Sequence, residues 1–328
     1  MQFTFPELDW KENMPVIRIA VADDDPDSAC YAAAVMAATL AQASEPLPPL
    51  PAQGKWSKPE KTLPENPKRL TLKQHVFPVR SIERFVDQSG RVSVFDMLRV
   101  KEHPARPEDI LFCARRAWDQ RTEAGITQIE NKFQEVVQPI IEGQVNTIAP
   151  EHKPAIDSMF ALWVMRTHFR GLAAQELQLF GVRGYDLTKA HEEHLESTDR
   201  LFVRRGGKVP ARQINGAQLQ LRVSSYTRDL AAALNGLGVV HAQAGEFIVP
   251  DVPTLKIAAF IPLSPTLALI GAVPDGDVVE QTVAEVNSAL KAGSREYYFA
   301  RDLSKCPFFA TSPSTDANVP ADSVQRIT

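Results

Sequence analysis

A histidine preceded by a glutamine is the pair of residues in this chain with the most direct chemical potential. His75 carries a titratable imidazole, and the amide of Gln74 offers both a donor and an acceptor that could orient the ring. Such a pair can act as a general acid–base and its orienting partner. The alternative is a histidine that only satisfies a local structural contact. The pair therefore predicts a site without defining a reaction.

One carboxylate and two arginines form a second set of candidates. At 100° per residue, Glu130 falls on the same helical face as Ile126 and Phe133, so its carboxylate lies in an apolar stripe. A carboxylate in that position must be paired or must raise its pKa. Arg166 and Arg170 are one turn apart on an otherwise apolar helix and could clamp a carboxylate or a phosphate. Alternatively, they simply neutralise Glu130 in a buried structural ion pair.

Asp251 is the last candidate, because it follows a predicted strand between Pro250 and Pro253. Aspartate at a strand end is a common place for catalysis and equally for the capping of a turn. Three other motifs do not fit known templates. The two histidines of His191-Glu192-Glu193-His194 are three residues apart, whereas a zinc helix needs four. Gly181-Val182-Arg183-Gly184 and Gly206-Gly207-Lys208 match no phosphate-binding loop.

A run of seven basic residues without an acidic one is the strongest charge feature. Lysine and arginine neutralise phosphate, so the run favours nucleic acid or a nucleotide as partner. It could also be a solvated basic face, or a surface that meets the acidic N-terminal segment. The aromatic residues are scattered and predict no stacking platform for a single strand. The basic residues are Arg200, Arg204, Arg205, Lys208, Arg212, Arg222 and Arg228.

Composition indicates a soluble globular protein, with 44% hydrophobic and 23% charged residues and a net charge of −4. Cys30, Cys113 and Cys306 are far apart and include no Cys-x-x-Cys pair, which argues against a zinc knuckle and a disulfide scaffold. We therefore expect a cytoplasmic protein. The longest apolar stretch, Ala29 to Ala41, is too short to cross a bilayer, so we expect no membrane partner. Protein partners cannot be inferred.

The predicted elements divide the chain into three parts. Residues 1–70 form an N-terminal arm, with an alanine-rich helix from Ala29 to Gln42 and a proline-rich linker from Ser44 to Pro67. Residues 71–310 form the domain, and residues 311–328 form a loose C-terminal tail. The fold class is α+β: a helix-dominated single domain with a small antiparallel sheet, preceded by the arm.

Hydrophobic periodicity gives the elements of the domain. The helix from Glu123 to about Val145 contains Pro139, which predicts a kink or an early end. We expect the helix from Leu187 to Leu201 to be peripheral because it is strongly charged. Further helices are predicted at Lys153–Leu177, at Ser225–Leu234 and, as one or two terminal helices, at Val278–Asp302. Strands are predicted at Arg91–Met97, Val239–Ala242, Phe247–Val249, Lys256–Ile261 and Leu267–Ala272.

These residues give the chain a resemblance to a bacterial family catalogued as domain of unknown function 4238. Such domains open with a Gln-His-x-x-Pro-x-x-x-Leu-x-x-Phe pattern, which here reads Gln74-His75-Val76-Phe77-Pro78, Ile82 and Phe85. The later elements follow in the same order from about Leu72 to Tyr298. They are Ile129-Glu130, Arg166-Thr167 with Arg170, Asp251-Val252-Pro253, Ile261-Pro262-Leu263-Ser264-Pro265, Asn287 and Arg295-Glu296-Tyr297.

The resemblance implies that these scattered polar residues belong to one pocket, but it supplies no reaction. Two departures are visible. Pro250 stands where a serine commonly precedes the aspartate, which would weaken a site that needs that hydroxyl. Val76 replaces the usual aromatic residue after the histidine.

Two functions from different classes follow. The first is a phosphodiesterase or nuclease-like hydrolase, with His75, Glu130 and Asp251 catalytic and with Gln74, Arg166 and Arg170 binding substrate. Glu130 and Asp251 would orient the histidine or hold a divalent ion such as Mg²⁺, although the sequence identifies no cofactor. The second is a non-enzymatic ligand- or partner-binding module in which the polar cluster is structural. The two differ in whether the cluster lines an open cleft.

Overall fold

The computed structural model describes Val35, Ala37 and Thr39, which are helical, and residues 59–172, 175–233, 236–253 and 259–309. Most of the predicted N-terminal arm and the C-terminal tail lie outside the described residues. Within them the chain has a mixed α+β fold, as predicted. Its helices and several small sheets alternate along the chain.

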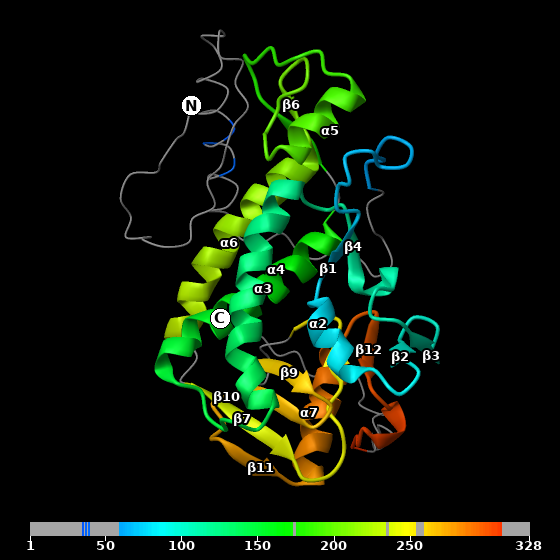
Figure 1. The fold of residues 1–328 in the computed structure, drawn as a ribbon, viewed down its shortest axis with the longest axis vertical. Helices are drawn as coiled ribbons and strands as arrows, with labels where there is room; N and C mark the ends of the chain where they lie inside the picture. Colours follow the sequence, from blue (N-terminus) through cyan, green and yellow to red (C-terminus); the bar gives the residue numbers. More distant parts are fainter. Residues whose placement is uncertain are drawn as a thin grey trace, which may run out of the picture.

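Three long helices run side by side through the middle of the molecule (Figure 1). Apolar side chains from them are completely buried, including Phe133, Trp163 and Leu219. No helix within the described ranges is long and apolar enough to cross a membrane. The helices of the described residues are α2 (Val79–Ile82), α3 (Gln120–Ile141), α4 (Lys153–Gly171), α5 (Lys189–Ser197), α6 (Ala211–Ala233) and α7 (Glu280–Gly293).

Helices α3 and α4 confirm the two helices that the hydrophobic periodicity predicts in this part of the chain. Helix α3 begins where the side chain of Asp119 accepts a hydrogen bond from the amide of Thr122, and it ends two residues after Pro139. Helix α4 is buried nearly all round, as predicted, but it ends at Gly171 because Leu172 is already extended. The chain then forms a short strand, β5 (Leu177–Gln178), instead of the predicted continuation of the helix.

Other expectations are wrong. Helix α5 lies at one end of the molecule (Figure 1), but one of its charged faces is not solvated, because Glu192 and Glu196 are buried against arginines and Glu193 accepts from the amide of Leu63. Helix α6 starts fourteen positions earlier than predicted, at Ala211 instead of Ser225. Of the one or two helices predicted at Val278–Asp302, one is present as α7, but strand β11 (Gly276–Val278) precedes it and Tyr297–Ala300 forms strand β12.

Two four-stranded sheets and two short ribbons replace the single predicted sheet. One sheet has the order β11-β7-β10-β9, in which only β11 is parallel to its neighbour, and the other has the order β3-β2-β12-β8. The ribbons pair β1 with β4 and β5 with β6. The remaining strands are β1 (Lys73–His75), β2 (Val92–Asp96), β3 (Lys101–Ala105), β4 (Cys113–Arg115), β6 (Lys208–Val209), β7 (Leu237–Ala242), β8 (Val249–Pro250), β9 (Phe260–Ser264) and β10 (Leu267–Gly271).

Strand β12 joins the second sheet to the helical core. Phe299 packs edge-on against Phe85 and Phe112, at 5.9 and 5.2 Å between ring centroids. Asn287 on α7 fixes the next layer, because its amide accepts from the backbone of Ile248 and donates to the carbonyl oxygens of Glu246 and Pro307. Side chains alternate between the two faces of a strand. Tyr297 and Phe299 of β12 therefore pack in the core with the long helices, and Tyr298 and Ala300 pack in the cluster that includes α7.

Replacing Phe299 with alanine should lower the free energy of unfolding by about 3–5 kcal/mol, because it leaves a cavity where three aromatic rings meet. Urea denaturation measures the difference. Phe180→Ala is the matched control, since Phe180 is 92% exposed and its loss should change stability by less than about 0.5 kcal/mol. Equal stability of the two variants would contradict this assignment of the core.

Candidate functional site

Gln74 and His75 point to opposite sides of the β1–β4 ribbon because successive side chains in a strand alternate. The Gln74 amide is buried and bound to the backbone of the next loop. Its oxygen accepts from the amides of Ala117 and Trp118 at 2.7 and 3.3 Å, and its nitrogen donates to the Trp118 carbonyl at 2.9 Å. Gln74 therefore braces the chain after β4 and is not the residue that orients His75.

The orienting group is the carbonyl oxygen of Pro107, which lies 3.1 Å from Nε2 of His75. A carbonyl can only accept, so Nε2 carries the hydrogen in this contact, and Nδ1 keeps the lone pair of the neutral ring. Burial lowers the pKa of His75 below its usual 6.5, and the nearby Arg166 acts in the same direction, against Glu130. The half-buried imidazole is thus held neutral with a defined basic nitrogen.

Arg166 and Glu130 form an ion pair between α4 and α3, with Nη1 of the arginine 2.5 Å from Oε1 of the glutamate. The side chain of Arg166 is 2% exposed and that of Glu130 is 23% exposed, so the carboxylate is the outer member. The Nε of Arg166 is buried without a hydrogen-bond partner in the described part of the chain. One donor of the guanidinium therefore has no hydrogen-bond partner among the described residues.

Glu123 is a member of this cluster that the sequence analysis missed. It lies seven residues before Glu130, hence on the same face of α3, and it accepts a hydrogen bond from the indole nitrogen of Trp118. Burial raises its pKa, although Arg166 opposes that effect. Two carboxylates therefore share the charge of Arg166. The seven-residue spacing was the available signal.

Cys113 is also close to His75, because the two residues are directly opposite each other in the β1–β4 pairing. Its thiol lies 3.5 Å from the carbonyl oxygen of Asp109, and burial raises its pKa to about 11. A nucleophilic cysteine needs a lowered pKa. Cys113 therefore does not have the properties of a nucleophile at neutral pH.

Arg170 and Asp251 form a separate group that connects α4 to the start of β12. The two oxygens of Asp251 accept from the amides of Arg295 and Glu296, both at 2.8 Å. Arg170 donates to the carbonyl of Leu111 at 3.0 Å and lies 3.5 Å from the carboxylate of Glu296. The structure thus pairs Glu130 with Arg166, and both charges act on the pKa of His75, whereas Gln74, Arg170 and Asp251 all bind backbone groups.

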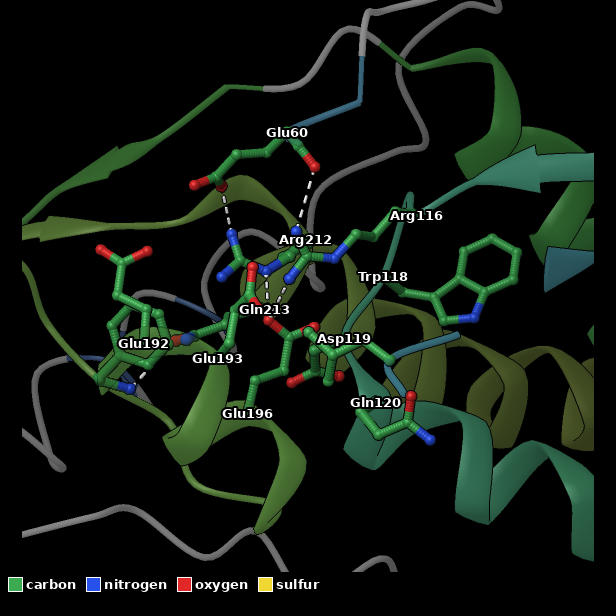
Figure 2. A network of polar contacts seen from close by, with 12 residues as sticks. Glu60, Arg116, Trp118, Asp119, Gln120, Glu192, Glu193, Glu196, Arg212 and Gln213 are labelled. Carbon is green, nitrogen blue, oxygen red and sulfur yellow. Dashed lines mark hydrogen bonds and ion pairs between the residues drawn. The ribbon is translucent and has the colours of Figure 1, made fainter. Parts of the chain in front are cut away.

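Part of the basic run is neutralised by acidic residues (Figure 2). Glu196 accepts from both Arg116 and Arg212 at 2.7 Å, and all three side chains are buried. Glu60, from the N-terminal segment, pairs with Arg204 and Arg212. Although burial alone would raise the pKa of Glu60, these arginines and Lys189 lower it to about 2. For Arg204 and Arg212, the interpretation as a surface that meets the acidic N-terminal segment is therefore correct.

A hollow of about 940 Å³ opens elsewhere, between the loop after Phe85 and the turn after β12, and none of the six candidate residues lines it. Its lining mixes Asp87, Glu102 and Asp302 with Arg301 and Lys305. Within the described ranges, no group of three or more His, Cys, Asp or Glu side chains is arranged to hold a metal ion. Glu130 and Asp251 are engaged by Arg166 and by backbone amides, so the residues present do not form a Mg²⁺ site.

Comparison of the chain with protein-family models, with curated proteins and with solved structures found no match. The resemblance to domain of unknown function 4238 stays a prediction that rests on the residues quoted above.

Removing only Arg166 should destabilise the protein by about 3 kcal/mol, because the Arg166→Met variant leaves the partly buried carboxylates of Glu123 and Glu130 without a counter-charge. The double variant Glu130→Gln/Arg166→Met should be more stable than Arg166→Met alone. Urea unfolding of the four proteins in this double-mutant cycle gives the coupling energy. Strictly additive effects would show that the ion pair does not couple α3 to α4.

Asp251 should make stability fall as pH rises from about 4 to 6. Burial raises its pKa to about 6, although Arg170 and two amides oppose it, so the folded state binds a proton that the unfolded state has lost at its usual pKa of 3.8. By linkage this amounts to roughly 3 kcal/mol across the window. The measurement is the free energy of unfolding at pH 4, 5, 6 and 7, and the wild-type value is compared with that of Asp251→Asn at each pH. A constant difference between them would contradict the raised pKa.

Proposed function

We propose that this chain is a phosphodiester-directed, nuclease-like hydrolase acting on nucleic acid or a nucleotide, with His75 as its general base. The observation that carries the proposal is the His75 geometry. The half-exposed imidazole is oriented by the Pro107 carbonyl, is held neutral by burial, and lies beside the positive charge of Arg166. A neutral histidine near the operating pH is the usual group for proton transfer in catalysis.

The proposed reaction uses only groups of this chain and water. Nδ1 of His75 takes a proton from a water molecule as the water oxygen forms a bond to phosphorus. The bond from phosphorus to the leaving oxygen breaks, and the imidazolium returns the proton to that oxygen. Arg166 supplies positive potential to the phosphoryl oxygens, and Glu130 fixes its guanidinium from the solvent side. No step is assigned to a metal ion.

We assign positioning roles to the other three candidates. Gln74 fixes the chain after β4, and Arg170 and Asp251 fix the turn before β12. We further propose that all six residues belong to one domain, residues 71–310, and that residues 1–70 are an arm that packs against it. The contacts of Glu60 with Arg204 and of Leu63 with Glu193 support this division.

A second candidate function is a non-enzymatic binding module in which the polar cluster is structural. One specific observation favours this function: the side chains of Gln74, Arg170 and Asp251 all form hydrogen bonds with backbone groups. In that case the protein would catalyse no hydrolysis, and replacing His75 would change no catalytic rate.

The His75→Asn variant should lose hydrolysis of an RNA or DNA oligonucleotide by about 10²- to 10⁴-fold, which is the usual contribution of a general base. Asparagine removes the titratable ring from a half-buried position of the β1–β4 ribbon but stays polar, so the variant should still fold. For wild type, kcat/KM should rise with pH to a plateau, with the midpoint of the rise below 6.5, because the base must be neutral and its pKa is lowered. Cleavage is measured with and without EDTA.

The control is His191→Asn, because His191 is exposed on α5 and far along the chain from the site. This variant should cleave as wild type does. Equal activity of wild type and His75→Asn, or no cleavage by either, would remove the hydrolase and leave the binding module.

A further inference from the structure

Two glycine-containing loops lie against each other at the end of the molecule that carries β6 and α5 (Figure 1). One loop follows β5, and the other leads into β6. The amide of Leu179 donates to the carbonyl of Gly207 at 2.8 Å, and the amide of Gly206 donates to the carbonyl of Arg183 at 2.6 Å. The two motifs that matched no phosphate-binding template are therefore one paired structure.

Glycine is required at two of these contacts. Gly184 has φ +64°, and a Cβ there would lie 2.1 Å from the carbonyl oxygen of Arg204. Gly207 has φ +79°, and a Cβ there would lie 2.2 Å from the carbonyl oxygen of Leu179. Side chains at these positions would force the loops apart. The close approach of the two loops is thus specified by the sequence.

The paired loops present one aromatic ring and three cations to solvent. Phe180 is 92% exposed, an unusual position for a phenyl ring. Arg183 and Lys208 are exposed, and no ion pair with a described residue holds either of them. Arg205 is 79% exposed and pairs at 3.1 Å with Asp186, which is 83% exposed. Such a pair contributes little, so Arg205 can exchange its partner for a phosphate.

We propose that Phe180, Arg183, Arg205 and Lys208, the loop-pair surface, bind single-stranded nucleic acid. A base would stack on the phenyl ring while the cations contact the flanking phosphates. A membrane surface fits less well, because peripheral membrane binding depends on a broad buried apolar face and Phe180 is the one exposed large apolar side chain of these two loops. The three free or weakly paired cations supply the charge complementarity that the neutralised Arg204 and Arg212 do not.

This inference deepens the proposed function, since it names where the nucleic acid would be held. It does not depend on catalysis at His75, which lies on the β1–β4 ribbon. Binding is therefore measured in the His75→Asn background, in which the probe stays intact. Loss of hydrolysis and loss of binding are then separate results.

The experiment titrates the full chain, as His75→Asn, into fluorescein-labelled oligothymidylate of twelve nucleotides and records fluorescence anisotropy. Adding Phe180→Ala should weaken binding by about 5- to 150-fold, the range for one stacked base. Three phosphate contacts predict a slope of log Kd against log salt of about 2, and Arg183→Gln/Lys208→Gln should reduce it by roughly 1.4. Phe180→Trp, in contrast to Phe180→Ala, should bind as tightly as the background protein, because it keeps an aromatic ring at this position.

Phe309→Ala and Arg99→Gln are the controls, because Phe309 is 49% exposed and the side chain of Arg99 is 80% exposed at other places in the fold. Both should bind as the background protein does. Anionic vesicles of phosphatidylcholine and phosphatidylserine form a second arm. Absence of oligonucleotide binding, binding that Phe180→Ala leaves unchanged, or capture by the vesicles in place of the oligonucleotide would overturn the proposal.

Discussion

The burial of arginine between helices is the constraint on which much of this structure depends. A guanidinium removed from water needs a carboxylate and further hydrogen bonds, or its desolvation is not offset. Arg166 illustrates the solution, since it lies inside the helical core and pairs with Glu130 from the neighbouring helix. The pair fixes how α3 and α4 meet. It also places a positive charge beside His75, and that charge helps to keep the imidazole neutral.

The same constraint operates where α3 and α6 begin. Arg116 and Arg212 converge on Glu196, and Arg212 also binds Glu60 from the N-terminal segment (Figure 2). Here the Arg116–Glu196 and Arg212–Glu60 pairs join residues that are 80 and 152 positions apart in the chain. These arginines are therefore not available to bind a phosphate group. Recognition of an anionic ligand must then use cations outside this network, such as those of the loop-pair surface.

Much of the fold could be predicted from local patterns. Helices α3 and α4 and strand β2 follow the expected periodicities because each has one continuous pattern of buried side chains. Strand β12 could not be predicted, since Tyr297 to Ala300 is a short run buried on both faces that looks the same as part of a helix. The buried glutamates of α5 were missed because the charge pattern of a helix cannot reveal whether arginines from distant segments cover it.

For the candidate site, the sequence by itself determined the residue types and the local geometry. The helical repeat put Glu130 in an apolar stripe and set Arg166 and Arg170 one turn apart, because those relations depend only on residues near each other in the chain. Tertiary structure alone decided the partners. It set Gln74 and Arg170 against backbone carbonyls, gave His75 the carbonyl of Pro107, and selected the Arg166–Glu130 ion pair that the sequence left as one of two alternatives. Such contacts depend on how the segments pack in space, which local periodicity does not encode.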